Sequence, residues 1–324
     1  MRALGALVWL AVVGPTASQD TPRIRVPVRL VTVPTLVLGA DNRPLADLQP
    51  GQLRLFDQDR GQTFSLDTSA APLSIVIAIQ ANLAIREYLP FVAKVGSTLE
   101  ALLVGSKGEA AILVYGDDVT LASDFGAAGL STGLHGIAPD GIRARAIDAG
   151  LRGLGLLAGR PASHTRVLLF IGQPEDDGSE YRLEDLRREA ERAMVSVHAF
   201  ALPLAGKAFV SDTFSLEGLS SSADRGGFKA GVDLTNLIPV LSRSAAASRK
   251  ADPFSMLVAA TGGTLLHFRK QTQLEDAISI LGVELRSLYT LSFPPSGEAG
   301  YHALRVESTI PGARTHARPG YWLD

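Results

Sequence analysis

The sequence predicts an α/β fold: a doubly wound, mostly parallel sheet, with a small accessory β unit built from the N- and C-terminal segments. Two observations predict it. Between residues 72 and 285, short runs of continuous apolar residues alternate with stretches of helical period, as in parallel sheets that helices cover on both faces. Toward both ends of the chain, apolar and polar residues alternate instead, which is typical of antiparallel strands.

The N-terminal β segment comprises residues 24–70. From Arg25 to Leu38 the alternation is rich in Val and Thr, which predicts an antiparallel strand with one solvent-exposed face. Residues 52–66 predict a second strand and a hairpin turn around Asp57 to Gly61. Two strands are marginal alone, so we expect the C-terminal strands to pair with them.

The central segment, residues 72–285, predicts the parallel sheet. Its buried strands are expected at 73–79, 109–116, 166–171 and 195–202. Helical spacing separates them at 88–103, 143–158 and 183–194. Residues 254–268 predict a helix, a glycine turn and a strand, and residues 273–287 predict the last helix.

Within this segment, residues 203–253 are rich in Ser, Ala and Gly, and we expect a mobile loop region with a short helix around residues 234–246. The C-terminal β segment, residues 286–324, follows the last helix. Its alternating stretches at 288–293 and 302–309 predict two strands.

The composition of the chain limits which classes of function are possible. In 324 residues, 46% are hydrophobic and 20% are charged, as in soluble globular proteins. The formal net charge of −2 provides no broad field for nucleic acid or an anionic membrane, so neither is expected as a partner. The absence of cysteine excludes disulfides and thiolate metal sites.

The first residues predict a signal peptide, residues 1–18. Arg2 precedes an apolar run from Ala3 to Val13, and small residues follow up to a cleavage position after Ser18. The run is too short to span a bilayer as a helix. We therefore expect a secreted or periplasmic protein with no transmembrane segment in the mature chain.

Several stretches carry a family resemblance: residues 28–66, 106–118 ("SKGEAAILVYGDD"), 259–263 ("AATGG"), 284–297 and 317–322 ("ARPGYW"). Their order resembles the von Willebrand factor type A family, and more narrowly the secreted bacterial branch called acidobacterial vWFA-related proteins. The resemblance covers nearly the whole mature chain. It implies a type A-like domain over residues 72–285.

The resemblance also implies a divalent-metal site at the carboxyl ends of the strands, made by Asp-x-Ser-x-Ser, a Thr and a further Asp. This sequence departs from that pattern at every position: Gln80 replaces the first Asp, Asn82 and Ala84 the serines, Ile142 the Thr and Gln173 the last Asp. Amides coordinate Mg²⁺ without neutralising its charge. We expect a degenerate site with no metal and no other cofactor, in which Gln80, Asn82 and Gln173 bind a polar partner directly.

Three other sets of residues could in principle bind metal or catalyse a reaction. Asp117, Asp118 and Glu175 to Asp177 could form a Ca²⁺ site, but their spacing fits no loop motif. Ser131 lies in a Gly-x-Ser-x-Gly pattern, yet residues 123–128 ("SDFGAA") do not predict the strand that a hydrolase nucleophile requires. The histidines are read as structural: His135, His164, His198, His267, His302 and His316.

We therefore expect a non-catalytic protein-binding module of the adhesion type, with an unidentified protein partner. Two alternatives stay open. One is a structural subunit of an envelope assembly that makes contacts through its sheet edges, and the other is a serine hydrolase that uses Ser131. The sequence identifies neither the partner nor the oligomeric state.

Overall fold

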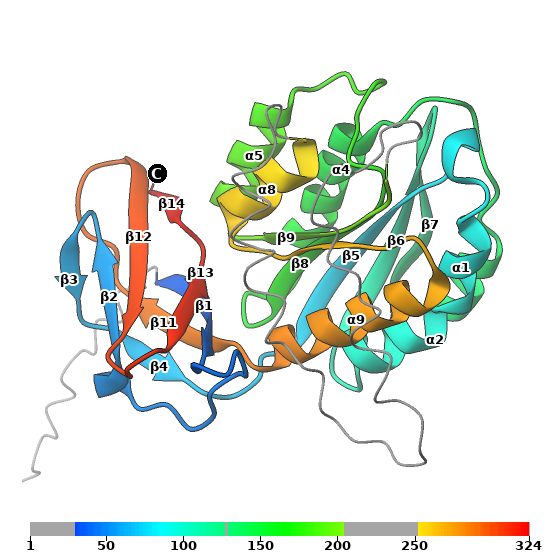
Figure 1. Cartoon of the computed structure of the whole chain (residues 1–324). Helices are drawn as coiled ribbons and strands as arrows, with labels where there is room; N and C mark the ends of the chain where they lie inside the picture. The colour runs from blue at the N-terminus through cyan, green and yellow to red at the C-terminus, as the bar shows by residue number, and fades with distance from the viewer. Residues whose placement is uncertain (1–29, 127–128, 204–251, 324) are drawn as a thin grey trace, which may run out of the picture.

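The computed structural model describes residues 30–126, 129–203 and 252–323, which form two units side by side (Figure 1). One is an α/β core and the other is a β sandwich. The predicted signal peptide and residues 204–251 of the predicted loop region lie outside the described residues. Within those residues, no helix has the length and apolar character that crossing a membrane requires.

The α/β core is built on a sheet of six strands. Across the sheet they are β10 (Leu265–His267), β9 (Ser196–Ala201), β8 (Thr165–Gly172), β5 (Leu73–Gln80), β6 (Glu109–Tyr115) and β7 (Val119–Gly126). All neighbours pair in parallel except β6 and β7. Every residue of β5 is buried, because β5 is central and covered on both faces.

Helices cover both faces of this sheet, which confirms the predicted doubly wound fold (Figure 1). One face carries α1 (Leu89–Lys94), α2 (Gly96–Leu99), the π-helical turn η3 (Glu100–Val104), α3 (Leu130–His135) and α9 (Gln271–Arg286). The other carries α4 (Ala146–Ala158), α5 (Leu183–Arg192) and α8 (Pro253–Thr261). Helix α8 ends at Gly262, whose φ of 71° is the left-handed conformation predicted for this turn.

The sequence analysis missed strand β7. Residues 123–126 of the "SDFGAA" stretch belong to it, so the expectation that no strand precedes Ser131 was wrong. Most of its side chains are exposed or half-buried, and its place is fixed by antiparallel pairing with β6. An edge strand of this kind is held by backbone hydrogen bonds and carries little apolar periodicity.

The β sandwich joins the two ends of the chain in two sheets of four strands each. The first contains β13 (Arg314–Ala317), β1 (Val31–Leu38), β11 (Tyr289–Phe293) and β4 (Ser65–Asp67). The second contains β14 (Gly320–Leu323), β12 (Gly300–Ser308), β2 (Leu53–Asp57) and β3 (Arg60–Gln62). The predicted pairing of N- and C-terminal strands is confirmed, although it forms two packed sheets with a core of their own.

Local features fix the registers of the sandwich. The β2–β3 turn has positive φ at both Gln58 (49°) and Asp59 (60°), the backbone of a two-residue hairpin. Buried Asp57 accepts hydrogen bonds from the Tyr321 hydroxyl and His302 Nδ1, each at 2.9 Å. His302 Nε2 also faces the Glu298 carbonyl oxygen at 2.9 Å, and this contact, with the one to Asp57, raises the pKa of His302. These contacts link β2, β12 and β14.

Strand β1 differs from the expected strand with one wet face. It lies between β11 and β13, and only Thr32 on its outer face is exposed, whereas Leu36 and Leu38 are buried. That face turns toward the α/β core, where Leu288 packs against the two leucines. Sequence alternation reports which face is apolar but not what covers the other.

The core is inserted between β4 and β11, which are antiparallel neighbours. Asp67, at the end of β4, pairs with Thr290 at the start of β11. The chain therefore enters and leaves the core at one place, next to the sandwich.

A buried carboxylate ties the two units together on another side. Glu191, at the end of α5, is 2% exposed. Its Oε2 accepts a hydrogen bond from Trp322 Nε1 of β14 at 2.8 Å, and its Oε1 accepts one from Arg187 Nη1 at 2.7 Å. The Arg192 guanidinium lies over the Trp322 ring, 5.5 Å from its centroid.

Glu191→Ala should lower the free energy of unfolding by roughly 2 kcal/mol, because the half-buried Trp322 indole N–H and the Arg187 guanidinium lose their shared acceptor. Urea unfolding at pH 7 measures this. Glu189→Ala, an exposed position on the same helix, is the matched control and should change stability by less than about 0.5 kcal/mol. Equal effects of the two substitutions would show that Glu191 does not hold the units together.

Candidate functional site

Three of the predicted site residues meet at the carboxyl ends of β5 and β8. Gln80 ends β5 and Gln173 directly follows β8, its parallel neighbour. Gln80 Oε1 accepts a hydrogen bond from the Gln173 backbone N–H at 2.6 Å, and Gln80 Nε2 donates to Asn82 Oδ1 at 3.1 Å. Strand β6 lies on one side of β5 and β8 on the other, so the strand order reverses here. Ligands of α/β proteins usually bind at this position.

Asn82 fastens the loop between α3 and α4 to the end of β5. Its Nδ2 donates to the carbonyl oxygens of Ile142 and Arg143 at 3.3 and 3.0 Å. Its Oδ1 also accepts from the Ala84 backbone N–H at 3.2 Å. With the bond from Gln80, both ends of this amide are fully engaged within the protein.

The three amide side chains are directed inward. Gln80, Asn82 and Gln173 are 0%, 1% and 4% exposed. Tyr115, at the end of β6, belongs to the same cluster, because a Cβ at Gly172 would lie 2.7 Å from Gln80 Oε1 and 2.8 Å from the Tyr115 hydroxyl oxygen. The sequence analysis did not single out Tyr115; its position at the end of a buried strand was the available signal.

Two atoms of this cluster, the Tyr115 hydroxyl oxygen and Gln173 Oε1, are buried without a hydrogen-bond partner among the described residues. Burial, and then the charges of Asp176 and Glu175, raise the pKa of Tyr115 above its ordinary value. The tyrosine is therefore neutral. An internal cluster of neutral groups organises loops and presents no charge to a ligand.

These donors do not fit a divalent cation. Ala84 has no side-chain oxygen, and Ile142 contributes only its backbone carbonyl while its side chain is 72% exposed. The Gln80 and Asn82 oxygens already accept hydrogen bonds, so Gln173 Oε1 alone is free. Mg²⁺ and Ca²⁺ require several oxygen ligands that include carboxylates.

The acidic residues near these loops bind backbone N–H groups. Asp117 Oδ1 accepts from Arg143 N at 2.8 Å and from Ile142 N at 2.9 Å. These two bonds, the Arg143 bond first, hold the pKa of Asp117 below its ordinary value. Gly141 makes the approach possible: its φ is +64°, and a Cβ there would lie 2.0 Å from Asp117 Cγ.

Carboxylates that follow β8 hold the start of helix α4. Asp176 Oδ1 accepts from Ile147 N at 2.9 Å and from the Ser179 hydroxyl at 2.6 Å, and Asp177 Oδ1 accepts from Ala144 N at 2.6 Å. Anions are stabilised at a helix N-terminus. Across residues 30–126, 129–203 and 252–323, no group of three or more His, Cys, Asp or Glu side chains is placed to hold a metal ion.

Ser131 lies near the start of helix α3, after Gly129, whose φ is 107°. Its own φ is not positive, whereas a nucleophile elbow holds the serine in a strained turn. His135, one helical turn later, is directed to the Ser131 backbone carbonyl through Nδ1 at 2.5 Å, not to its hydroxyl. His164 and His302 bond to side chains within the fold, and His198 accepts from Thr264 N through Nδ1 at 3.0 Å.

The surface of this end of the sheet carries large apolar side chains. Leu83 is 50% exposed and Tyr181 is 58% exposed, alongside Ile142. Leu83 and Ile142 are adjacent, because Leu83 N donates to the Gly141 carbonyl oxygen at 3.0 Å. The sequence analysis missed Leu83 because an exposed leucine in a loop has no distinguishing pattern.

Neither a family model nor a curated protein matches the sequence. Among solved structures, a von Willebrand factor type A protein from Catenulispora acidiphila is similar over 92% of this chain and 75% of its own, with 6% identity and a TM-score of 0.47. The conserved hypothetical protein BatB from Bacteroides thetaiotaomicron is similar over 66% of this chain and 98% of its own, with 13% identity and a TM-score of 0.43.

An aerotolerance-related membrane protein from Bacteroides fragilis, carrying multiple mutations to serines, is similar over 65% of this chain and 98% of its own, with 14% identity and a TM-score of 0.40. Solved structures described as von Willebrand factor type A domains are thus among those similar to this chain. At these identities the likeness concerns the fold alone.

Asn82→Ala should lower the free energy of unfolding by about 3 kcal/mol, because buried groups on both sides of the amide lose their partners. Asn82→Asp should be destabilising too, since it places an oxygen against the carbonyl oxygens of Ile142 and Arg143. Thermal and urea unfolding measure both variants. If Asn82→Ala leaves stability unchanged, the amide does not hold this loop.

Millimolar Mg²⁺, Mn²⁺ or Ca²⁺ should leave the thermal midpoint of the protein unchanged, and chelators should have no effect. Bound metal at a hundred times its dissociation constant would add roughly 2.7 kcal/mol, which shifts the midpoint visibly. The combined changes Gln80→Asp, Asn82→Ser, Ala84→Ser, Ile142→Thr and Gln173→Asp should create metal-dependent stabilisation. A wild-type midpoint that rises with Mg²⁺ and falls with chelator would contradict the degenerate site.

Proposed function

We propose that this chain is a non-catalytic, secreted or periplasmic protein-binding module of the adhesion type that has lost its divalent-metal site. Its protein partner docks on the loops at the carboxyl ends of the parallel strands. One observation carries the proposal: the amide side chains are buried and hold the loops, whereas the side chains of Leu83, Ile142 and Tyr181 are exposed on the surface.

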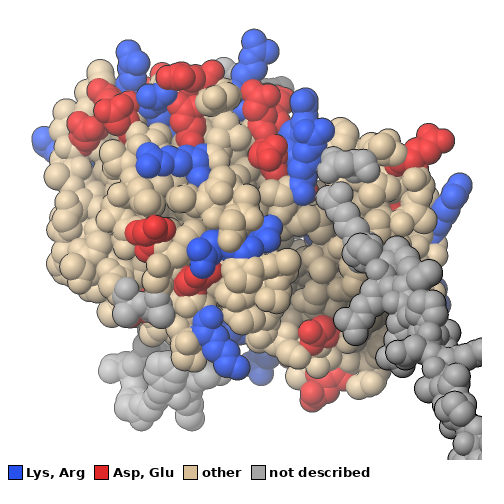
Figure 2. Space-filling view, turned by 180° about the vertical axis from the view of Figure 1, so that it is seen from behind, with Lys and Arg blue, Asp and Glu red and all other residues tan. Residues whose placement is uncertain are grey.

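Exposed apolar and tyrosine side chains on rigid loops suit a protein interface, where such residues form the anchors and charged residues form the rim. Arg145 and Glu180 supply charges of both signs beside Tyr181, and they pair with each other at 2.8 Å. On the face shown in Figure 2, basic and acidic side chains are likewise intermixed, so that face offers no field of one sign to a nucleic acid. Contact through Gln80 and Asn82 themselves would require the loops to open.

Leu83→Asp with Ile142→Asp should abolish partner binding, with at least a tenfold loss of affinity, because interface anchors are typically worth about 1 kcal/mol or more each. Both side chains are exposed, so the fold should persist. The measurement is a cross-linking pull-down from the native envelope with wild-type and variant bait, followed by titration of the captured protein.

Leu121→Asp is the matched control, an exposed leucine on edge strand β7. It should retain the captured protein. Capture that survives the loop substitutions and is lost with Leu121→Asp would instead favour the envelope-assembly alternative, in which sheet edges make the contacts. Labelling by a generic esterase probe that Ser131→Ala abolishes would contradict a non-catalytic role.

A further inference from the structure

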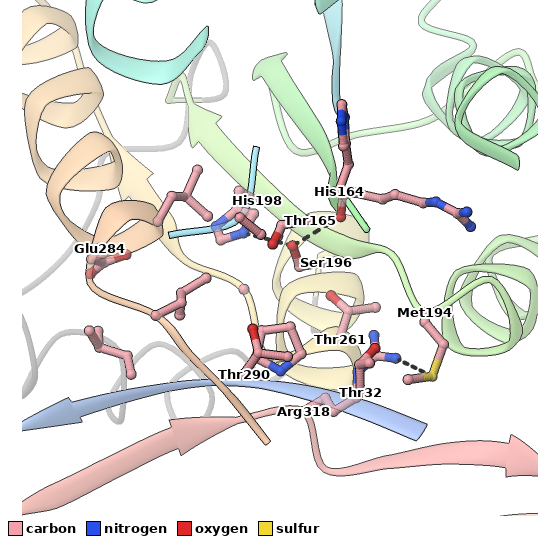
Figure 3. A pocket seen from close by; sticks show the side chains of 18 of the residues that line it. Thr32, His164, Thr165, Met194, Ser196, His198, Thr261, Glu284, Thr290 and Arg318 are labelled. Atoms are coloured by element: carbon pink, nitrogen blue, oxygen red, sulfur yellow. Dashed lines mark hydrogen bonds between the residues drawn. The ribbon is translucent and has the colours of Figure 1, made fainter. Parts of the chain in front are cut away.

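A second site lies between the β sandwich and the α/β core. It is a cavity of about 550 Å³, bounded by the outer face of β1 on one side and by the starts of β8, β9 and β10 on the other (Figure 3). The cavity therefore opens where the parallel strands begin, whereas Leu83 and Ile142 lie where these strands end. Small-molecule sites are typically 300–1,000 Å³ in volume and often lie at domain interfaces.

The charged residues that line this cavity are mostly cationic. Among the described lining residues are Arg166, Arg192 and Arg318, against a single carboxyl group, that of Glu284. Burial raises the pKa of Glu284 to about 7, so this carboxyl group is only partly ionised at neutral pH. Its Oε2 accepts a hydrogen bond from the Thr264 hydroxyl at 2.6 Å. The cavity accordingly carries an excess of positive charge.

Arg318 is the most buried of these cations, at 4% exposure. Its Nη1 is directed to the Met194 sulfur at 3.0 Å, and its Nη2 donates to the Val195 carbonyl oxygen at 3.3 Å (Figure 3). A thioether is a weak acceptor. Burial lowers the pKa of Arg318 to about 10, which leaves it cationic at neutral pH.

No described carboxylate lies within 4.0 Å of the Arg318 guanidinium. Glu191 attracts it from farther away, but both oxygens of Glu191 already bond to Arg187 and Trp322. An isolated buried charge is strongly destabilising unless an opposite charge accompanies it. The guanidinium fork matches a carboxylate, which can accept two parallel hydrogen bonds from it.

Two more polar atoms of lining residues lack partners among the described residues: Arg166 Nε and His316 Nε2, both buried. Water could satisfy such atoms, since a cavity of this size admits it. Water cannot neutralise the charge of Arg318. An anion does both.

Part of the wall is apolar. Leu36 and Leu38 of β1 lie on one side, and Leu285 and Leu288 lie at the end of α9 and just beyond it. Inorganic phosphate or sulfate would leave this surface uncovered. We propose that the cavity binds a small organic carboxylate with an apolar body, whose acid group pairs with Arg318 and whose body packs against the four leucines.

Calorimetric titration of the full chain with octanoate at pH 7 tests this proposal. Octanoate should bind, and octanamide, which has nearly the same shape without the charge, should bind at least about tenfold more weakly, since a charge-assisted hydrogen bond contributes roughly 1.5–3 kcal/mol. Inorganic phosphate should bind more weakly than octanoate. Absence of octanoate binding, equal binding of octanamide, or tighter binding of phosphate would each overturn the proposal.

Arg318→Met should weaken octanoate binding by about tenfold or more while raising the thermal midpoint of the ligand-free protein, because it removes an unpaired buried charge and keeps the volume. Arg188→Met is the matched control, an exposed arginine of α5 that does not line the cavity, and should retain the affinity. Wild-type affinity in Arg318→Met would overturn the role of this residue.

Thr32→Trp tests the location without touching Arg318. Thr32 is an exposed residue of β1 that faces the cavity, so a tryptophan there fills the space without entering either core. Octanoate binding should be lost in this variant. Unchanged affinity would place octanoate elsewhere and refute the cavity as its site.

Discussion

Strand β1 can be placed only between two strands from the other end of the chain, and much of the structure depends on this constraint. It pairs with β11 on one edge and β13 on the other, while β2 pairs with β12 in the second sheet. Neither sheet of the sandwich can form until the ends meet. Closing so long a loop is entropically unfavourable, whereas β8 and β9 of the α/β core are joined locally through α5. We infer that the core folds first and brings the sandwich strands together.

Buried polar groups at the two ends of the parallel strands differ in how many hydrogen-bond partners they have. At the carboxyl ends of the strands, the amides of Gln80 and Asn82 hydrogen-bond to one another and to the adjacent backbone. These bonds hold the loops in place. At the amino ends of the strands, the hydrogen-bond partners of Arg318 among the described residues are a thioether and one carbonyl oxygen. A fold rarely leaves a buried cation so poorly compensated without a functional reason. On our two proposals, the apolar surface loops and the cationic cavity would give the protein two separate recognition surfaces.

The sequence was sufficient to predict the parallel strands because burial on both faces leaves continuous apolar runs, as in β5. It was insufficient for β7, where backbone pairing at the sheet edge leaves no such pattern. The meeting of Gln80 and Gln173 followed from the rule that parallel strands end at one edge. The inward orientation of Asn82 did not, because it depends on carbonyl groups at residues 142 and 143, far away in sequence. The cavity around Arg318 was unforeseeable for the same reason: its walls come from strands of both chain ends and from the core.

The adjacent entry and exit of the core, at Asp67 and Thr290, have a mechanical consequence. Tension applied between the two ends of the described chain passes through the hydrogen-bonded ladders of the sandwich. The α/β core branches off behind the β4–β11 pair and carries no load while that pair stays intact. Its surface loops would therefore keep their shape under pulling forces that a domain threaded in series would have to bear. A partner-binding surface on these loops, as proposed, would be shielded from the load that binding itself produces.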